Sequence, residues 1–155
     1  MRTWGRPACL PLLVSLLALA GAQEAWLEVT PNQGKPLFEL SLTDEPSWII
    51  RWNHSVTGIT VSDYYRWDGT NMLLTNSHTP AFDAGLGHIP GRGRLESDGQ
   101  GGYWILDINE PVPNNAYLLR VGSERVNHRI LHDGKTYFLS DVAANERVRI
   151  GVVLR

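Results

Sequence analysis

Strict alternation in the closing stretch "RVRIGVVLR" constrains the fold more than any other feature of the sequence. Apolar side chains stand at every second position from Val148 to Leu154, and Arg147 and Arg149 stand between them. Successive side chains of a β-strand point to opposite faces, so this period of two predicts a strand with one buried face. After residue 22 no stretch carries a convincing period of 3.6 residues. The sequence therefore predicts an all-β fold.

Short apolar or alternating runs, separated by Gly, Pro, Asn and Asp, follow one another along the rest of the chain. They predict a single-domain antiparallel β-sandwich or barrel of about ten short strands. Asp133-Gly134 joins two such runs and predicts a β-hairpin. The predicted strands are Trp26–Thr30, Leu37–Leu42, Trp48–Val56, Ile59–Trp67, Met72–Thr75, Gly93–Ser97, Tyr103–Ile108, Tyr117–Val121, Asn127–His132, Thr136–Ser140 and Arg147–Leu154.

The beginning of the chain has the layout of a secretory signal peptide. Arg2 and Arg6 provide a positive charge, Leu10–Ala20 is an apolar run, and Ala20-Gly21-Ala22 offers a cleavage site. The apolar run is shorter than the roughly 20 residues that span a membrane. We expect residues 1–22 to be removed and residues 23–155 to form one β-domain that is exported, periplasmic or extracellular. Membrane contact is expected only through an uncleaved signal segment.

Charge and cysteine content exclude several classes of function. The formal net charge is −2 and the basic residues are scattered, so nucleic acid is not an expected partner. Cys9 is the only cysteine, and it precedes the apolar run of the signal. The predicted mature chain therefore lacks a thiolate nucleophile, a disulfide and a cysteine ligand for zinc.

The stretch "IIRWNHSVTG" carries His54 and Ser55 side by side at the end of a predicted strand. Because neighbours in a strand face opposite ways, these two cannot form a nucleophile–base pair with each other. Parity places His54 with Trp48 and Trp52. His54 is then either the polar end of this apolar row or an imidazole that faces a ligand. No catalytic residue is predicted.

The stretch "AFDAGLGHIPGRGR" is a glycine-rich corner that begins at residue 81. Gly85 and Gly87 permit a close approach of the backbone to a ligand, and Arg92 and Arg94 follow shortly after. Backbone amides in such a turn, with guanidinium groups nearby, would suit a carboxylate. The alternative is a bulge or tight corner that only serves closure of the sheet.

Histidines offer a second, different chemistry. No pair of the five histidines has the spacing of a metal site on one helix or strand. A site assembled in space from His54, His88 and His128 stays open, and it would fit a periplasmic metal-dependent hydrolase or lyase. Otherwise the sequence predicts no metal and no cofactor.

Several short motifs, taken in order, resemble a family of small exported proteins, the domain-of-unknown-function family eighteen-fifty. They are "HSV" at 54–56, "DYYRW" at 63–67, "AFDAGLG" at 81–87, "LLRVGSERVNHRI" at 118–130 and a closing hairpin. The resemblance implies an accessory protein encoded beside TAXI-type TRAP transporters, which import organic acids. It implies no established activity.

These observations favour a non-enzymatic exported β-domain that acts as an accessory or binding module in organic-anion transport. The expected partner is a transporter component or a small carboxylate ligand. We expect that ligand near His54, the glycine-rich corner and the segment that begins at residue 118. The candidate ligand-binding residues are His54, Phe82, Gly85, Gly87, Arg120 and Asn127.

Overall fold

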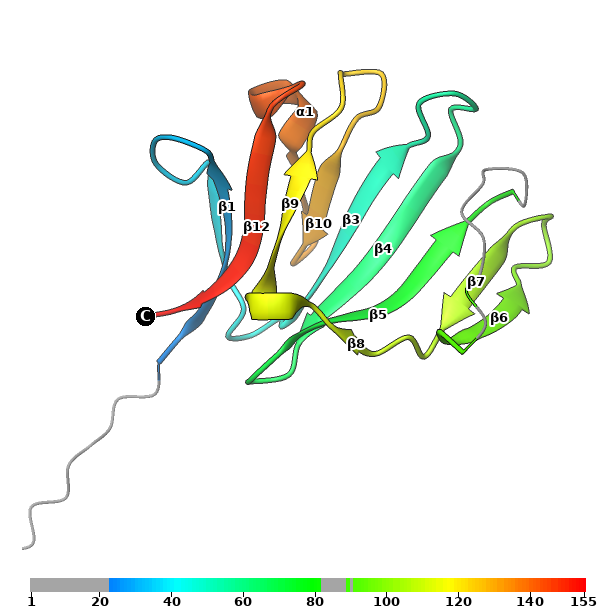
Figure 1. Ribbon diagram of the computed structural model, residues 1–155, viewed down its shortest axis with the longest axis horizontal. Coiled ribbons are helices and arrows are strands. Elements are labelled where there is room, and N and C mark those ends of the chain that lie inside the picture. Colours follow the sequence, from blue (N-terminus) through cyan, green and yellow to red (C-terminus); the bar gives the residue numbers. More distant parts are fainter. Residues whose placement is uncertain (1–22, 82–88, 90) are drawn as a thin grey trace, which may run out of the picture.

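The computed structural model describes residues 23–81, 89 and 91–155. These residues form two antiparallel sheets, which confirms the predicted all-β class. The small sheet has four strands in the order β2-β1-β12-β9, and the large sheet has eight, ordered β11-β10-β3-β4-β5-β7-β6 with β8 paired to β5 (Figure 1). The elements are β1 Ala25–Pro31, β2 Phe38–Ser41, β3 Ser47–Asn53, β4 Thr60–Trp67, β5 Met72–Thr79, β6 Arg94–Ser97, β7 Tyr103–Leu106, β8 Glu110–Pro111, the 3-10 helix η2 Pro113–Asn115, β9 Ala116–Arg120, β10 Arg129–His132, β11 Lys135–Phe138, α1 Leu139–Ala143 and β12 Arg147–Leu154.

The closing strand β12 forms as its alternation predicts. Val148 and Ile150 are fully buried, and Arg147 and Arg149 are exposed. β12 lies between β1 and β9, and Ile150 pairs with Val29 of β1, which is also fully buried. The buried faces of these strands therefore form one wall of the core.

The large sheet provides the other wall of the core. Trp48 and Ile50 of β3 and Ile130 of β10 are almost completely buried, and they belong to the same apolar cluster as Val148. The Trp48 ring stacks on Tyr65 of β4 with the centroids 5.7 Å apart. Full burial of each large apolar side chain contributes roughly 1.5–3 kcal/mol. Alternation along β3 therefore fixes which face is available for function, because the other face is used by the core.

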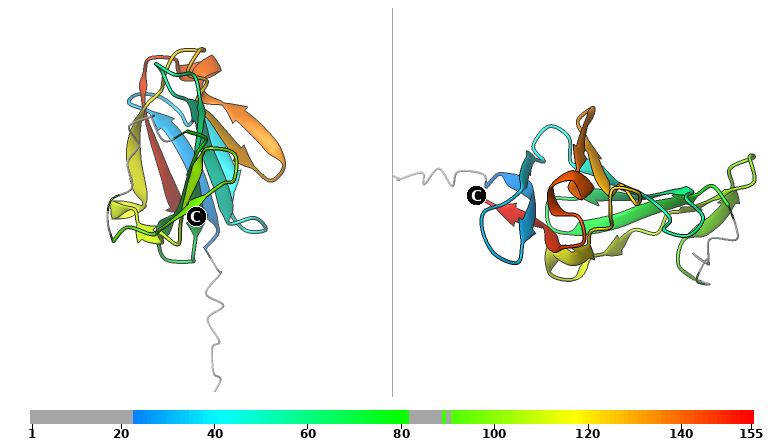
Figure 2. Two further views of the ribbon diagram at one scale, coloured as in Figure 1. Left: turned by 90° about the vertical axis from the view of Figure 1, so that its right-hand side faces the viewer. Right: turned by 90° about the horizontal axis from the view of Figure 1, so that it is seen from above.

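The large sheet extends beyond the small sheet. Figures 1 and 2 show β6 and β7 at the end of the molecule that is far from β1 and β12. β7 pairs with the second half of β5, from Ser77 to Thr79, and β6 pairs with β7. This part of the large sheet therefore has an inner face that the small sheet does not cover.

The hairpin predicted at Asp133-Gly134 is confirmed. Both residues have positive φ, 47° and 67°, as a two-residue turn that matches strand twist requires. The turn sets the register of β10 and β11, in which His132 pairs with Lys135.

Several predicted strand boundaries differ from the structure, and three of the differences matter for the site or the fold. β3 ends at Asn53 and does not run to Val56, while β5 continues beyond Thr75 to Thr79 through a bulge. The strand predicted over Thr136–Ser140 ends at Phe138, and helix α1 begins at Leu139. The first two amides of α1 donate to the carbonyl of His128. Among the described residues no helix is both long enough and apolar enough to cross a membrane.

Candidate functional site

His54 belongs to the turn between β3 and β4, and not to the apolar row of β3. The strand ends one residue earlier, and the His54 amide donates to the Ile59 carbonyl at 2.7 Å. The ring turns back on the same loop, where Nδ1 accepts the Thr57 amide at 3.3 Å and lies 3.1 Å from Thr57 Oγ1. Ser55 is exposed in this turn. One imidazole nitrogen of His54 is therefore already used by the local fold.

Arg120 and Asn127 belong to segments of different sheets, joined by a short loop in which the Asn127 amide donates to the Ser123 carbonyl at 3.0 Å. Arg120 ends β9 and is exposed opposite Arg147 of β12, on the outer side of the small sheet. Asn127 precedes β10 in the large sheet, with φ of 50°. The carbonyl just before it, that of Val126, accepts the amide of Asn53 at 2.7 Å. The structure thus brings Asn127 close to the end of β3 that leads into His54, whereas Arg120 is exposed on the other sheet. The three remaining candidates, Phe82, Gly85 and Gly87, lie outside the described residues.

Two arginines face each other on the outer side of the large sheet. Arg51 of β3 pairs directly with Arg129 of β10 in the antiparallel register. Each alternates with buried core residues, Ile50 and Ile130, so both guanidinium groups project away from the core. Side chains directly opposite in such a pair have Cβ atoms about 5 Å apart. Like charges therefore lie side by side on this face.

Each arginine is held by a single neutral acceptor. Arg51 Nε donates to Ser62 Oγ on β4 at 3.0 Å, and Arg129 Nη1 donates to the Asn127 carbonyl at 2.8 Å. Within the described residues neither arginine has a carboxylate within ion-pair distance. The remaining N–H groups of both guanidinium ions are therefore available, since an arginine carries five donors.

The electrostatics of the pair are unfavourable without an anion. Partial burial and the neighbouring Arg51 lower the pKa of Arg129. Both causes act against the charged form, and no acidic side chain offsets them in the described part of the chain. Like charges directly opposite in a sheet destabilise it. An anion placed between the two guanidinium groups would remove this repulsion and gain charge-assisted hydrogen bonds.

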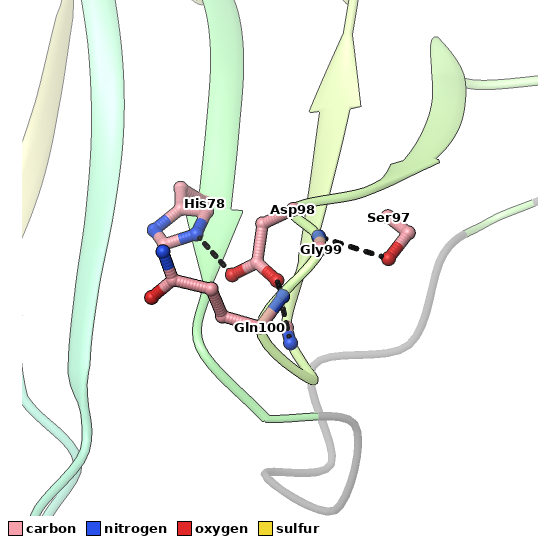
Figure 3. A network of polar contacts seen from close by, with 6 residues as sticks. His78, Ser97, Asp98, Gly99 and Gln100 are labelled. Carbon is pink, nitrogen blue, oxygen red and sulfur yellow. Dashed lines mark hydrogen bonds and ion pairs between the residues drawn. The ribbon is translucent and has the colours of Figure 1, made fainter.

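The row that contains the arginines continues across the large sheet. Ser62 pairs with His78 of β5, and His78 pairs with Trp104 of β7, whose ring centroid lies 4.4 Å from that of the imidazole. His78 Nε2 lies 3.0 Å from Asp98 Oδ2. Figure 3 shows that the other Asp98 oxygen accepts the Gln100 amide, at 2.8 Å. These backbone and imidazole contacts lower the pKa of Asp98, so the carboxylate holds the His78 ring in place.

An open groove lies next to the arginine pair. Its volume is about 780 Å³. Ile49, Tyr64 and Leu131 line it from the outer face of the large sheet. Ile49 pairs with Leu131 one row along from Arg51 and Arg129, a step of about 7 Å along the strands. The lining is mixed, because Glu45, Asp107 and Asp133 also belong to it, and neither arginine does. A groove large enough for an organic molecule therefore lies one row from the two positive charges.

The arginines that follow the glycine-rich corner already have carboxylate partners. Arg92 Nε donates to Glu110 Oε2 at 2.6 Å. Arg94 forms ion pairs with Glu96 and with Asp107. Their charges are thus compensated locally, which sets them apart from Arg51 and Arg129.

The described histidines have structural partners. His128 is buried, its Nδ1 accepts the Gly122 amide at 2.8 Å, and burial lowers its pKa to about 4. His132 bridges the two sheets, because its ring nitrogens lie 3.0 Å and 2.9 Å from the carbonyls of Ser47 in β3 and Ser41 in β2. No three His, Cys, Asp or Glu side chains within residues 23–81, 89 and 91–155 could hold a metal ion together. His88 lies outside these residues.

Strand alternation contains a signal for the arginine pair that residue types alone do not reveal. Both arginines interrupt strongly apolar strands, in "IIRWN" and "NHRIL", and alternation already puts Arg51 on the face opposite Ile50. The partner of Arg51 depends on the pairing of β3 with β10, two strands far apart in the chain. Only the structure brings the two charges together.

Comparison with known proteins places the chain in a family and not in a functional class. No curated protein and no solved structure matches it. The model of the domain of unknown function DUF1850 matches residues 49–139, from β3 to the start of α1. The match spans more than half of the chain and includes the whole face that carries Arg51 and Arg129. The chain therefore belongs to the DUF1850 family.

Proposed function

We propose that this chain is an exported accessory domain that binds a small organic carboxylate on the outer face of the large sheet. The observation that carries the proposal is the pair Arg51 and Arg129, which face each other in register without a carboxylate partner among the described residues. Arg120 and Arg147 also face each other, across β9 and β12, but both are exposed. Arg51 and Arg129 differ from them because both are half-buried and a groove lies one row away.

The neighbouring surface supports a carboxylate with an organic body. A planar guanidinium group matches the two oxygens of a carboxylate, and a second one opposite it can share the same ion. The carboxylate would lie between Arg51 and Arg129, and the rest of the ligand would contact Ile49, Tyr64 and Leu131 in the groove. Asn127 belongs to this site through its backbone, since its carbonyl orients Arg129. His54 directly follows Asn53, the last residue of β3.

We propose that this binding serves an organic-anion transport system of the TAXI-type TRAP class. The resemblance noted from the sequence motifs supports this link, and membership of the DUF1850 family is consistent with it. The domain would then present or sense the anion for a transporter component rather than transform it. Affinity capture from the native organism, with a crosslinker and the double variant Arg51→Gln/Arg129→Gln as the matched control, tests this part. Recovery of transporter subunits with the wild-type chain is expected, and equal recovery with both chains would argue that the arginine face plays no role in it.

Ligand binding itself is tested by calorimetry at low salt. The probes are acetate, succinate and benzoate, with acetamide and benzamide as neutral controls. A hydrogen bond to a charged group contributes about 1.5–3 kcal/mol, so Arg51→Gln and Arg129→Gln should each weaken carboxylate binding by roughly 10- to 150-fold. Arg147→Gln, an exposed arginine on the other sheet, is the matched control and should bind normally. No heat with any acid, or equal binding by Arg51→Gln, would refute the proposal.

A further inference from the structure

A second, smaller cavity lies on the inner side of the large sheet, opposite the arginine face. Its volume is about 220 Å³, which corresponds to about seven waters at liquid density. Trp52 and Val61 line it from paired positions on β3 and β4, alternating with the outward-facing Arg51. Leu74, Ile105 and Ile108 complete an apolar wall. The cavity can therefore hold a molecule of about the size of an amino acid.

Among the described residues, Asp63 is the one carboxyl-bearing side chain that lines this cavity. Asp63 of β4 pairs with Ser77 of β5, and Ser77 Oγ donates to Asp63 Oδ1 at 2.7 Å. This is the only hydrogen bond to the Asp63 carboxyl among the described residues, so Oδ2 retains its capacity to accept. Burial raises the pKa of Asp63. A carboxylate in apolar surroundings with one neutral partner is stabilised by a cationic donor.

One guanidinium group lines the same cavity. Arg92 uses Nε for Glu110 Oε2, and within the described residues its two terminal nitrogens have no partner. Glu110 is fixed by the pairing of β8 with Leu74 of β5. Arg92 lowers the pKa of Asp63 through its charge, yet no ion pair joins the two side chains. The cavity lining therefore includes a carboxyl group and a guanidinium group that influence each other through charge but form no ion pair.

We propose that this cavity binds a small apolar α-amino acid as its zwitterion. The ammonium group would donate to Asp63 Oδ2, and the carboxylate would accept from the terminal nitrogens of Arg92. The aliphatic side chain would contact Leu74, Ile105 and Ile108. Glu110 compensates the charge of Arg92 through Nε, but the terminal nitrogens of Arg92 can still donate. A zwitterion pairs with Asp63 and with these nitrogens at once. A simple amine leaves the terminal nitrogens without an acceptor among the described residues, and a simple acid places a second carboxylate near Asp63. This site shares no residue with the arginine face.

Calorimetry with leucine and its two truncated analogues tests the proposal. 3-Methylbutylamine lacks the carboxylate of leucine, and 4-methylpentanoate lacks the ammonium group. The test uses the Arg51→Gln/Arg129→Gln chain, because the proposed carboxylate site on the outer face of the wild type would also bind 4-methylpentanoate. In that chain leucine should bind at pH 7, and each analogue should bind at least about tenfold more weakly, since each loses a hydrogen bond to a charged group. Equal binding of leucine and either analogue would overturn the assignment of both charges.

Variants locate the site and separate it from the arginine face. Asp63→Asn should weaken leucine and 3-methylbutylamine alike, while Arg92→Gln should weaken leucine but not the amine. Arg94→Gln is the matched control, because Arg94 pairs with Glu96 and Asp107 and does not line the cavity. Ile108→Phe changes no charge and should reduce binding by filling the cavity. The double variant Arg51→Gln/Arg129→Gln should bind leucine normally even if carboxylate binding on the outer face fails. Unchanged leucine binding by Asp63→Asn or by Ile108→Phe, or no binding by the wild-type chain, would overturn the proposal.

Discussion

The two facing arginines make a quantitative prediction about the stability of the fold. Arg51 and Arg129 are direct partners across β3 and β10, so in the absence of an anion their side chains should repel by about 0.2–1 kcal/mol. Single substitutions alone do not isolate this energy. Arg51→Gln also removes the 3.0 Å bond to Ser62, and Arg129→Gln removes the 2.8 Å bond to the Asn127 carbonyl. Each lost bond costs about 0.5–1.5 kcal/mol.

A double-mutant cycle cancels the two lost hydrogen bonds and leaves the interaction between the arginines. The four chains are wild type, Arg51→Gln, Arg129→Gln and the double variant, and the free energy of unfolding is measured by urea denaturation with tryptophan fluorescence. At low salt without ligand we expect an unfavourable coupling of about 0.2–1 kcal/mol. It should vanish in 1 M KCl, where charges are screened over about 3 Å.

A bound carboxylate should reverse the sign of this coupling. With saturating succinate the two guanidinium groups bind the same ion. Removing either one therefore weakens succinate binding and reduces the stabilisation that the other provides through it. The ligand stabilises only the chain that binds it, by an amount set by its concentration relative to the dissociation constant. We expect the coupling to become favourable by about 1 kcal/mol or more. A coupling that is favourable without ligand, or one that succinate does not change, would refute the reasoning.

Three further predictions concern the rest of the fold. Burial lowers the pKa of His128 to about 4, so the folded chain binds fewer protons than the unfolded chain between pH 4 and 6.5. The free energy of unfolding should therefore fall by at most about 3 kcal/mol as the pH drops through this window. Urea titrations should show a smaller fall for His128→Gln. Burial raises the pKa of Asp63, so the free energy of unfolding changes with pH in the opposite direction. The contribution of Asp63 to stability is greatest below about pH 4 and is lost as the pH rises through the raised pKa. Melting temperatures measured against pH should not show this decline for Asp63→Asn. In Gly102→Ala the new Cβ would lie 2.6 Å from the Thr79 carbonyl oxygen and would also collide with Asp98 Oδ2. We therefore expect the free energy of unfolding to fall by about 1–3 kcal/mol and the His78 imidazole signal to change by NMR. Gln100→Ala, at an exposed position of the same turn, should leave both unchanged.

Local patterns in the sequence predicted the strands but not the partners of the strands. Alternation in "RVRIGVVLR" predicts both the strand β12 and its buried face, because a period of two has one structural meaning. The same rule puts Arg51 on the outer face. It cannot supply Arg129 as its neighbour, since pairing between distant strands depends on the packing of the whole core.

His54 and helix α1 show where the local rules stop. The alternation rule applies to His54 only if β3 includes it. The strand ends at Asn53, because His54 belongs to a turn in which its Nδ1 accepts the Thr57 amide. Helix α1 is five residues long, too short for a helical period to be visible in the sequence. Its first two amides bind the His128 carbonyl, a contact made by the tertiary fold. The prediction that Phe82, Gly85 and Gly87 contact a ligand stays a prediction, because they lie outside the described residues.

The central claim is that Arg51 and Arg129 together hold a carboxylate, and NMR of the arginine Nε–Hε groups tests it most directly. Titration with succinate at low salt should shift the Arg51 and Arg129 signals along one saturable curve, with a common dissociation constant. The signals of Arg120 and Arg147, exposed on the outer side of the small sheet, should not follow this curve. Small, unsaturable shifts of equal size for all four arginines would contradict the claim, because they would show only a general response to ionic strength.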